Sequence, residues 1–553
     1  MMFEYLELNA IEDENTREFI RRLMNMVETL SIENRELKEE NQRLRDEINR
    51  MKGEQGKPKN KGNRPQPISS NHSSEAERKK ARPRHKRSKQ AEIEIDREEV
   101  VEVDRKTLPE DVQFKGYVDV IVQDIRITSD NVRFRKEKYY SARQRKSYVA
   151  ELPEGYQGQF GPGIQALILA LYYGIGTSEP KILEFLENVG VQISAGEISN
   201  VVIKKQARFH AESEAVYLAG LASSPWQQTD DTLTRINGEN QHCHVVCNPV
   251  YTSYHTRKSK ERMSVLDVLR HGQKRLHRLN AEGIGYLGGV KWSKKVWHIL
   301  EEWQSEEDWE EAAFVERLEK ALPKLRKQQR KVLMDATAVA AYHAQTDEPV
   351  LQVLVCDDAP QFNWLGREMM LCWVHEGRPY KKLQPVMECH RKLLDDYLTS
   401  FWAYYEQLLA YREKPTAEDH VRLEDAFDTL FTTRTGYDAL DERIAKTRVK
   451  KDSLLVVLKY PELPLHNNAS ELGVRQRVRK RDVSFGPRTV DGARAWDTFA
   501  TLAETTKKLK VSFYHYLQDR ITRQNQISPL AELVTIRAKE LNLGWSFSST
   551  PNY

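Results

Sequence analysis

The chain of 553 residues is 30% charged and 39% hydrophobic, so it is long enough for several domains and carries a large solvated surface. Its 86 Lys and Arg residues outnumber its 82 Asp and Glu residues by only four, so affinity for nucleic acid would have to come from local clusters of basic residues. Five cysteines, an odd number, and the lack of a run of about eighteen apolar residues argue against a disulfide-bonded secreted protein or a membrane protein and predict a cytoplasmic one.

The first predicted element is a leucine zipper within residues 1–52. Its seam repeats every seven positions and is formed by Leu23, Val27, Leu30, Asn34, Leu37, Asn41, Leu44, Ile48 and Met51. Each seam asparagine can satisfy its amide against the same residue of a second chain, which favours a parallel homodimer in register. The alternative is a surface helix that packs on its own domain.

Residues 53–92 predict a disordered basic linker, because Ile68 is the only aliphatic residue larger than alanine between residues 53 and 90. Basic residues are concentrated between residues 78 and 89, and the candidate DNA-binding residues there are Arg78, Lys79, Lys80, Arg82, Arg84, Lys86 and Arg87. Such a cluster can neutralise several backbone phosphates, although a solvated tether would have the same composition.

Two small modules are predicted before residue 221. Over residues 93–160, β-branched runs at 118–122 and 125–128 alternate with charged residues and predict a β-rich module. Residues 161–220 predict helices, one of which begins after a capping serine, Ser194. A helix pair joined by a glycine-containing turn is typical of DNA-reading modules, but ordinary helical packing explains the pattern equally well.

Residues 221–520 predict an α/β domain with helical insertions, followed by a C-terminal tail at 521–553. Strands are expected over 224–255, with Asp230 near the end of the first, and a buried strand over 350–356 leads to Asp357. Helical patterns fill about 271–347, which we interpret as an insertion, and 384–447. A helix from about 468 to 481 contains Glu471, and another over 490–517 completes the domain.

Asp230 and Asp357 are candidate functional residues because the carboxyl end of a strand presents side chains to the cleft of an α/β sheet. With Glu471 they could hold Mg²⁺ ions, which prefer carboxylate oxygens and assist phosphodiester cleavage. Single aspartates at strand ends often only begin turns. Asp230 and Asp357 are each followed directly by a second aspartate. We favour the first of each pair as the functional residue, with Asp231 and Asp358 as supporting residues.

Glu471 has two structural explanations besides chemistry. Residues 468–471 fit a capping box in which Asn468 caps the helix and Glu471 occupies its third position. The carboxylate could also pair with Arg475, one helical turn later. Arg475 and Arg479 belong to a basic cluster on the same helix, which suits either DNA phosphates or solvent.

Three weaker patterns are interpreted as structural. Residues 242–247, His-Cys-His-Val-Val-Cys, resemble zinc ligands, but on a strand the histidines and the cysteines face opposite ways, so we expect no zinc there. Residues 283–288 match the glycine spacing of dinucleotide-binding proteins without a preceding buried strand, so we expect a loop. His375 is too isolated to define a metal site and is expected to support the cleft.

The ordered motifs resemble those of the Insertion Sequence 66 family of transposases, and the resemblance covers most of the chain. The motifs that carry it are Asp230-Asp-Thr232, Asp357 with Phe362, Leu371-Cys-Trp-Val-His375 with Arg378, Asn467-Asn-Ala-Ser-Glu471 with Arg475, Ser484-Phe-Gly486, Thr505-Thr506 and Tyr516-Leu517. Many members of that family carry a cysteine-based zinc module before the catalytic region. Residues 91–160 contain no cysteine here, so zinc is not expected.

The resemblance implies an α/β, ribonuclease-H-like catalytic core in which Asp230, Asp357 and Glu471 bind two Mg²⁺ or Mn²⁺ ions to cut and join DNA. His375 and Asn468 would support these ligands. Double-stranded element ends and target DNA would be the substrates, in a bacterial nucleoid, with accessory transposition proteins as further partners. Two rival functions stay open: a retired transposase that only binds and regulates DNA, and a nuclease that cuts without joining.

Overall fold

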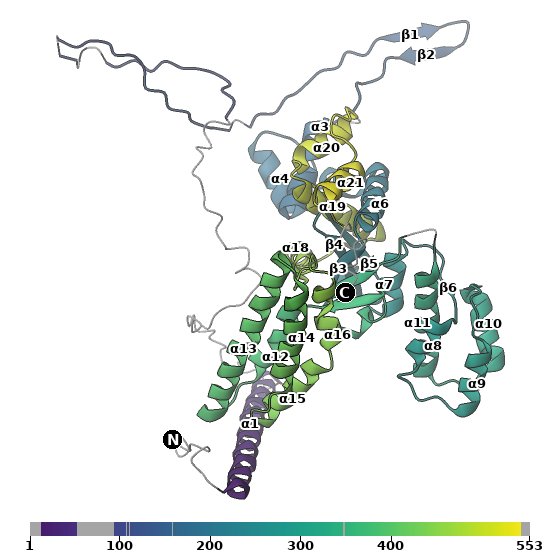
Figure 1. The fold of residues 1–553 in the computed structure, drawn as a ribbon. Coiled ribbons are helices and arrows are strands. Elements are labelled where there is room, and N and C mark those ends of the chain that lie inside the picture. Colours follow the sequence, from purple (N-terminus) through teal and green to yellow (C-terminus); the bar gives the residue numbers. More distant parts are fainter. Residues whose placement is uncertain are drawn as a thin grey trace.

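The computed structural model describes residues 13–51 and 93–543, except residues 105, 107, 110, 126, 157, 158, 347 and 348 (Figure 1). The predicted basic linker, with its candidate DNA-binding residues, therefore lies outside the described residues. The described chain is mixed α/β and mostly helical, with a mixed five-stranded sheet at its centre. No helix in these described segments combines the length and the hydropathy needed to cross a bilayer.

The central sheet has the strand order β5-β4-β3-β8-β9. Its strands are β3 (Trp226–Ile236), β4 (Glu239–Asn248), β5 (Tyr251–Arg257), β8 (Val353–Cys356) and β9 (Glu368–Leu371). Strands β3, β4 and β5 are antiparallel neighbours, whereas β8 runs parallel to β3 and β9 runs parallel to β8. All four side chains of β8 are fully buried, as is typical of a strand that is covered on both faces.

Helices from distant parts of the sequence cover the β5 side of the sheet. Helix α19 (Val490–Leu509) packs on β5, and α6 (Ala207–Ala222) packs beside it. Gly220 permits the close approach of α6, because a Cβ atom there would lie 2.6 Å from the ring of Tyr251. The other members of this layer are α3 (Pro162–Leu169), the π-helical segment η4 (Ala170–Ile175), α4 (Glu179–Asn188), α5 (Ala195–Ile203), α20 (Phe513–Thr522) and α21 (Leu530–Glu540). Ser194 caps α5 as predicted.

The structure differs from two predicted boundaries in this layer. The helices of residues 161–220 do not form a separate module, because Trp496 of α19 packs in one core with Ile168 and Ile182. The predicted tail at 521–553 contains α21, whose Leu530 and Val534 are fully buried in the main core. The sequence pattern of an amphipathic helix shows that one face is buried but not which distant helix it packs against, so the shared core could not be predicted.

Helices also fill the segment between β5 and β8, most of which is the predicted insertion at about 271–347. They are α7 (Arg262–Leu269), α8 (Ala281–Leu287), α9 (Lys294–Glu302), α10 (Glu311–Ala321) and α11 (Lys327–Ala344), with the short strands β6 (Leu276–His277) and β7 (Trp309–Glu310). The glycine-rich segment 283–288 lies mostly in α8 rather than in the loop we expected. Asn280 caps this helix by accepting a hydrogen bond from the Gly283 N–H at 3.0 Å, which helps to offset the low helix propensity of glycine.

A second helical layer packs on the β8 and β9 side of the sheet. It contains α12 (Trp373–Lys382), α13 (Glu388–Glu413), α14 (Ala417–Thr432), α15 (Asp438–Arg448), α16 (Lys451–Leu454) and α17 (Val456–Lys459). Trp373 is fully buried among aromatic rings that include Phe401 and Tyr404. The predicted zipper segment forms one uninterrupted helix, α1 (Glu14–Met51), which lies beside this layer (Figure 1).

The predicted β-rich module over residues 93–160 is reduced to one hairpin among the described residues. Its strands are β1 (Lys138–Ser141) and β2 (Lys146–Val149). The run 118–122 forms no strand, and Val118 is 92% exposed. A β-branched run becomes a strand only where a neighbouring strand and a buried face are available, and the structure supplies neither here.

Candidate active site

The register between β3 and β8 brings the first two acids together. Gln228 pairs with Val355, so two residues further along the chain Asp230 in β3 stands level with Asp357, the first residue after β8. Equivalent positions of neighbouring strands point to the same face of a sheet. We predicted Asp230 near the end of its strand, but β3 continues to Ile236 and Asp230 lies in its middle. The parallel pairing with β8 nevertheless ends at Gln228, two residues before Asp230.

Helix α18 (Asn468–Ser484) brings Glu471 to the same place because its first turn is fastened to β3. The Ser470 hydroxyl donates a hydrogen bond to the carbonyl oxygen of Thr229 at 3.2 Å. The side-chain oxygen of Gln228 accepts a hydrogen bond from the Ala469 N–H at 3.0 Å. These bonds attach the third acid to the strand residues that directly precede Asp230.

A glycine one turn into α18 sets how closely this helix approaches the sheet. A Cβ atom at Gly473 would lie 2.9 Å from Cγ1 of Val245 on β4. The Tyr254 hydroxyl also donates a hydrogen bond to the Gly473 carbonyl at 3.0 Å. Any larger residue would push α18, and Glu471 with it, away from the two strand acids.

Glu471 does not cap α18. The helix begins after Asn467, whose side chain makes no capping hydrogen bond, and the capping box that we considered is therefore wrong. The Glu471 carboxylate instead faces α12. Arg378 donates to its Oε1 at 2.8 Å, and His375 Nε2 lies 3.1 Å from the same oxygen. The considered pair with Arg475 is long, at 3.9 Å.

The electrostatics of the three acids are those of a crowded, poorly hydrated cluster. Burial raises the pKa of Asp230 to about 7, and the carboxylates of Asp357, Asp231 and Glu471 also raise it, partly offset by the Asp231 N–H. Burial likewise raises the pKa of Asp357, and His375 opposes this effect. Carboxylates that resist ionisation in this way favour the binding of a cation among them.

The donor types suit Mg²⁺, which prefers carboxylate oxygens on a rigid frame. Among the described residues, however, no three His, Cys, Asp or Glu side chains are arranged so that they could hold a metal ion as they stand. The partners of Glu471 offer a physical reason, because Arg378 and His375 already satisfy its Oε1. Asp230, Asp357 and Glu471 therefore fit a metal site in chemistry, provided that Glu471 exchanges these partners.

Both supporting aspartates have partners that the sequence did not reveal. Gln361 donates a hydrogen bond to Asp231 at 2.9 Å. Asp358 pairs with Lys450 at 2.6 Å, and the same ammonium group lies 2.9 Å from the buried Glu376. No local pattern could have identified Gln361, Lys450 or Glu376, because each acts through a contact between segments far apart in sequence.

The basic cluster on α18 divides into exposed and buried residues. Arg475 and Arg479 are exposed and lie one turn apart, as a DNA-binding surface would require. Arg477 and Lys480 point inward and bond to the protein itself, and burial lowers the pKa of Lys480 to about 7. Asn468 is buried, and its backbone N–H donates to the ring of His466 at 3.3 Å.

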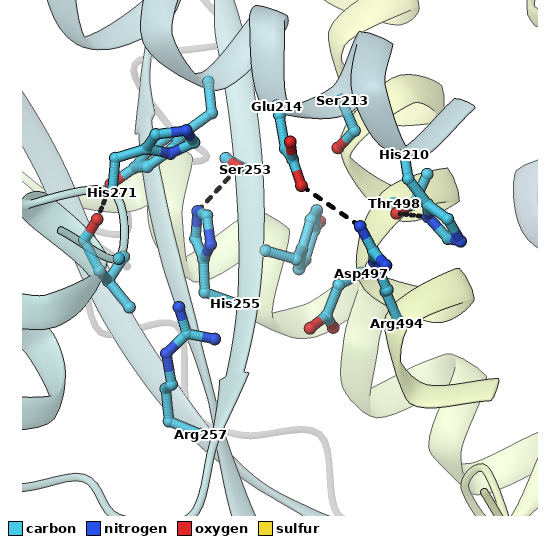
Figure 2. Close-up of a pocket in the computed structure, with 14 residues that line it drawn as sticks. His210, Ser213, Glu214, Ser253, His255, Arg257, His271, Arg494, Asp497 and Thr498 are labelled. Atoms are coloured by element: carbon cyan, nitrogen blue, oxygen red, sulfur yellow. Dashed lines mark hydrogen bonds and ion pairs between the residues drawn. The ribbon is translucent and has the colours of Figure 1, made fainter. Parts of the chain in front are cut away.

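A cavity of about 330 Å³ lies elsewhere, between α6, β5 and α19 (Figure 2). None of the three predicted acids lines it. Its two carboxylates already have partners, since Glu214 pairs with Arg494 at 3.4 Å and Asp497 pairs with Arg477 at 3.1 Å. We therefore place the candidate active site at the strand acids and not in this cavity.

Comparison with known proteins identifies the family of the chain. A family model described as "Transposase IS66 family" matches residues 338–495, a range that includes Asp357, Glu471, His375 and Arg378 but not Asp230. The uncharacterized protein y4jO of Sinorhizobium fredii (strain NBRC 101917 / NGR234) is 33% identical over 324 residues, which are 58% of this chain and 99% of that protein. The chain therefore belongs to the IS66 family of transposases.

Proposed function

We propose that the chain is an active DNA transposase that cuts phosphodiester bonds at element ends and joins those ends to target DNA. The observation that supports this most directly is the placement of Asp230 and Asp357 at one level of two parallel strands, with Glu471 attached beside them. The sheet supports a ribonuclease-H-like core, because three antiparallel strands are followed, after an insertion, by two strands parallel to the first.

In this proposal Asp230, Asp357 and Glu471 would hold two Mg²⁺ or Mn²⁺ ions. Such ions, when bound, stabilise the attacking and leaving oxygens of an in-line displacement. The strands fix two of the carboxylates, and α18 supplies the third. Arg378, which pairs with Glu471 here, would offer its planar set of donors to a DNA phosphate if Glu471 became a metal ligand. The attacking group is first water and then a DNA 3′-hydroxyl, so no protein side chain forms a covalent intermediate.

DNA would lie along the positive rim beside the acids. The side chains of Arg378 and Arg475 are 49% and 48% exposed, and Arg479 continues this row along α18. Phosphate contacts of this kind position DNA without reading its sequence. The basic linker at 53–92 would add salt-sensitive affinity, and this part stays a prediction from the sequence.

The zipper seam would pair two copies of the chain. The seam leucines Leu30, Leu37 and Leu44 are 57%, 65% and 49% exposed on the single chain. An exposed seam of this length, apolar except for Asn34 and Asn41, is typical of a surface that a partner covers. Two paired chains would bring one active site to each end of an element. The involvement of accessory proteins stays a prediction.

The test uses purified protein, Mg²⁺ and a pool of labelled DNA fragments from the flanks of the gene. We expect fragments that are cut at one position and then joined to a second DNA, and we expect neither product in the presence of a chelator. Binding without cutting would favour the retired regulator, and cutting without joining would favour the nuclease. Either result would overturn the proposal, given a cognate end in the pool.

A further inference from the structure

Helix α1 contacts the rest of the chain through a face that is not its leucine seam. Met24, Asn25 and Glu28 are 4%, 8% and 2% exposed, although they belong to a long helix that is otherwise mostly solvated. Asn25 and Glu28 bond to the turn between α14 and α15 and to the start of α13, and Figure 1 shows α1 beside these helices. Two of the three buried residues are polar, so this contact depends on specific hydrogen bonds.

Glu28 provides a cap for α13 from outside that helix. Its carboxylate accepts hydrogen bonds from the backbone N–H groups of Val386 and Met387, the latter at 2.9 Å, and lies 3.1 Å from Nδ1 of His390. Met387 occupies the capping position of α13 and has no side-chain oxygen to offer. A carboxylate at a helix start satisfies free N–H groups and interacts favourably with the helix dipole.

Asn25 makes the second anchor, on the turn before α15. Its side-chain nitrogen donates to the carbonyl oxygen of Gly436 at 2.9 Å, and its side-chain oxygen accepts from the Asp438 N–H at 3.1 Å. The turn fits the helix closely, because a Cβ atom at Gly436 would lie 2.8 Å from Nε of Arg21. Both donor and acceptor of the Asn25 amide are therefore used, which fixes the register of α1 on this surface.

The two anchors belong to one continuous surface. The ring of His390, which contacts Glu28, stacks on Tyr437 with centroids 4.4 Å apart and planes 11° from parallel. Tyr437 stands between the two turn residues that bind Asn25. The contact surface thus joins the start of α13 to the start of α15, and α1 is fastened to both.

The leucine seam points elsewhere. At about 100° per residue, the seam is centred roughly 100–150° around the helix axis from Met24, Asn25 and Glu28. Leu30 and Leu37 accordingly stay more than half exposed while these three residues are buried. Asn25 and Glu28 lie on a face that pairing through the seam leaves free, and Met24, in the same heptad position as Lys38, lies at the edge between the two faces, so α1 can dock and pair at once.

The charges beside the seam match a second copy of the same chain. Glu33 and Glu40 flank the seam on one side, and Lys38 and Arg45 flank it on the other. In a parallel pair in register, Glu33 would face Lys38 of the second copy, and Glu40 would face Arg45. Glu40 pairs with Arg43 of its own helix in the single chain, and pairing would compete with that contact.

We propose that α1 is a two-faced connector: its Asn25 and Glu28 face is fixed to α13 and α15 of its own chain, and its seam pairs with a second copy. The dimer then holds two catalytic domains at a set distance and orientation instead of on free tethers. The inference deepens the proposed pairing through the seam, but the docking of α1 on its own chain does not depend on that pairing or on catalysis.

The test compares the full-length wild type with Asn25→Ala/Glu28→Ala and with a matched control, Glu36→Ala, whose side chain is exposed on the same helix. Hydrogen–deuterium exchange should accelerate about tenfold or more at Val386, Met387 and Asp438 in the double variant only, because those amides lose buried acceptors. Glu28→Gln, which retains an acceptor oxygen, should show a smaller increase in exchange. This conservative variant keeps the test valid if the double variant misfolds.

Sedimentation and small-angle X-ray scattering complete the test. The double variant should remain a dimer, with a larger and broader distribution of dimensions than wild type and the control. Unchanged exchange would overturn the docking, and a monomeric double variant would show that this face is itself the dimer interface. No readout uses DNA or a metal, so failure here is distinguishable from failure of the proposed transposase activity.

Discussion

Asp230→Asn should stabilise the metal-free protein at pH 8 and not at pH 4. The pKa of Asp230 is about 7 in the folded chain, against an ordinary value of 3.8, because burial and neighbouring carboxylates disfavour its charge. Between these two values the folded state binds more protons than the unfolded state, so the free energy of unfolding falls as the pH rises through this window. Below the lower value both states are protonated, and the effect of the charge vanishes.

The size of the effect follows from the same pKa. A rise from 3.8 to about 7 corresponds to at most about 4 kcal/mol at 1.36 kcal/mol per pKa unit, and residual hydration of this half-buried group reduces the expected gain to about 1–3 kcal/mol. The asparagine oxygen can still accept the Asp231 N–H that Asp230 binds at 2.8 Å. The substitution therefore removes charge with little change of contact.

Pulse proteolysis in urea at pH 4 and pH 8, with chelator or with Mg²⁺, measures both consequences. Mg²⁺ should stabilise wild type at pH 8 but not Asp230→Asn, because the variant lacks one carboxylate ligand. Asp482→Asn, the same change at a side chain that is 66% exposed, is the control and should behave like wild type. Loss of stability in Asp230→Asn at pH 8, or equal stabilisation of both proteins by Mg²⁺, would refute the reasoning.

Three further substitutions test other parts of the account. Arg378→Ala should tighten Mn²⁺ binding severalfold, because Glu471 loses a competing cation; the gain in binding free energy is about 0.5–1 kcal/mol, as for a half-exposed ion pair. Weaker Mn²⁺ binding, measured by electron paramagnetic resonance, would contradict this. Gly473→Ala should lower the free energy of unfolding by about 1–3 kcal/mol, and with it the urea midpoint, because the new methyl group displaces α18 from β4. An unchanged midpoint would show that the helix can shift freely. Leu30→Glu with Leu37→Glu should give a monomer by sedimentation while leaving hydrogen exchange at the α13 start unchanged, and a persistent dimer would rule out the seam as the interface.

Local patterns predicted the elements that carry their own signal. The heptad gave one long helix, Ser194 gave a helix start, and the apolar run before Asp357 gave the buried strand β8. The strand-end aspartates and the resemblance to a known family pointed to the three acids, and the β3–β8 register and the bonds between α18 and β3 bring them to the same part of the sheet. These features could be predicted from the sequence because periodicity, capping and motif order depend on neighbouring residues.

Contacts between segments far apart in sequence could not be predicted in this way. The sequence offered a capping role for Glu471, but its carboxylate is held by α12, from a different part of the chain. No sequence pattern singled out Glu28, which is nearly fully buried at the start of α13. In both cases the partners of a polar side chain are set by tertiary packing and not by its neighbours in sequence.

In the proposed mechanism, Asp230, Asp357 and Glu471 act together to cut and join DNA. The most direct measurement is a joining assay with Mg²⁺ on a labelled element end, comparing wild type with Asp357→Asn and with Asp482→Asn as the folded, matched control. We predict joined product with wild type and with Asp482→Asn, and a loss of at least about a hundredfold with Asp357→Asn, as expected for removal of a metal ligand. Joined product from Asp357→Asn at the wild-type rate would contradict the account.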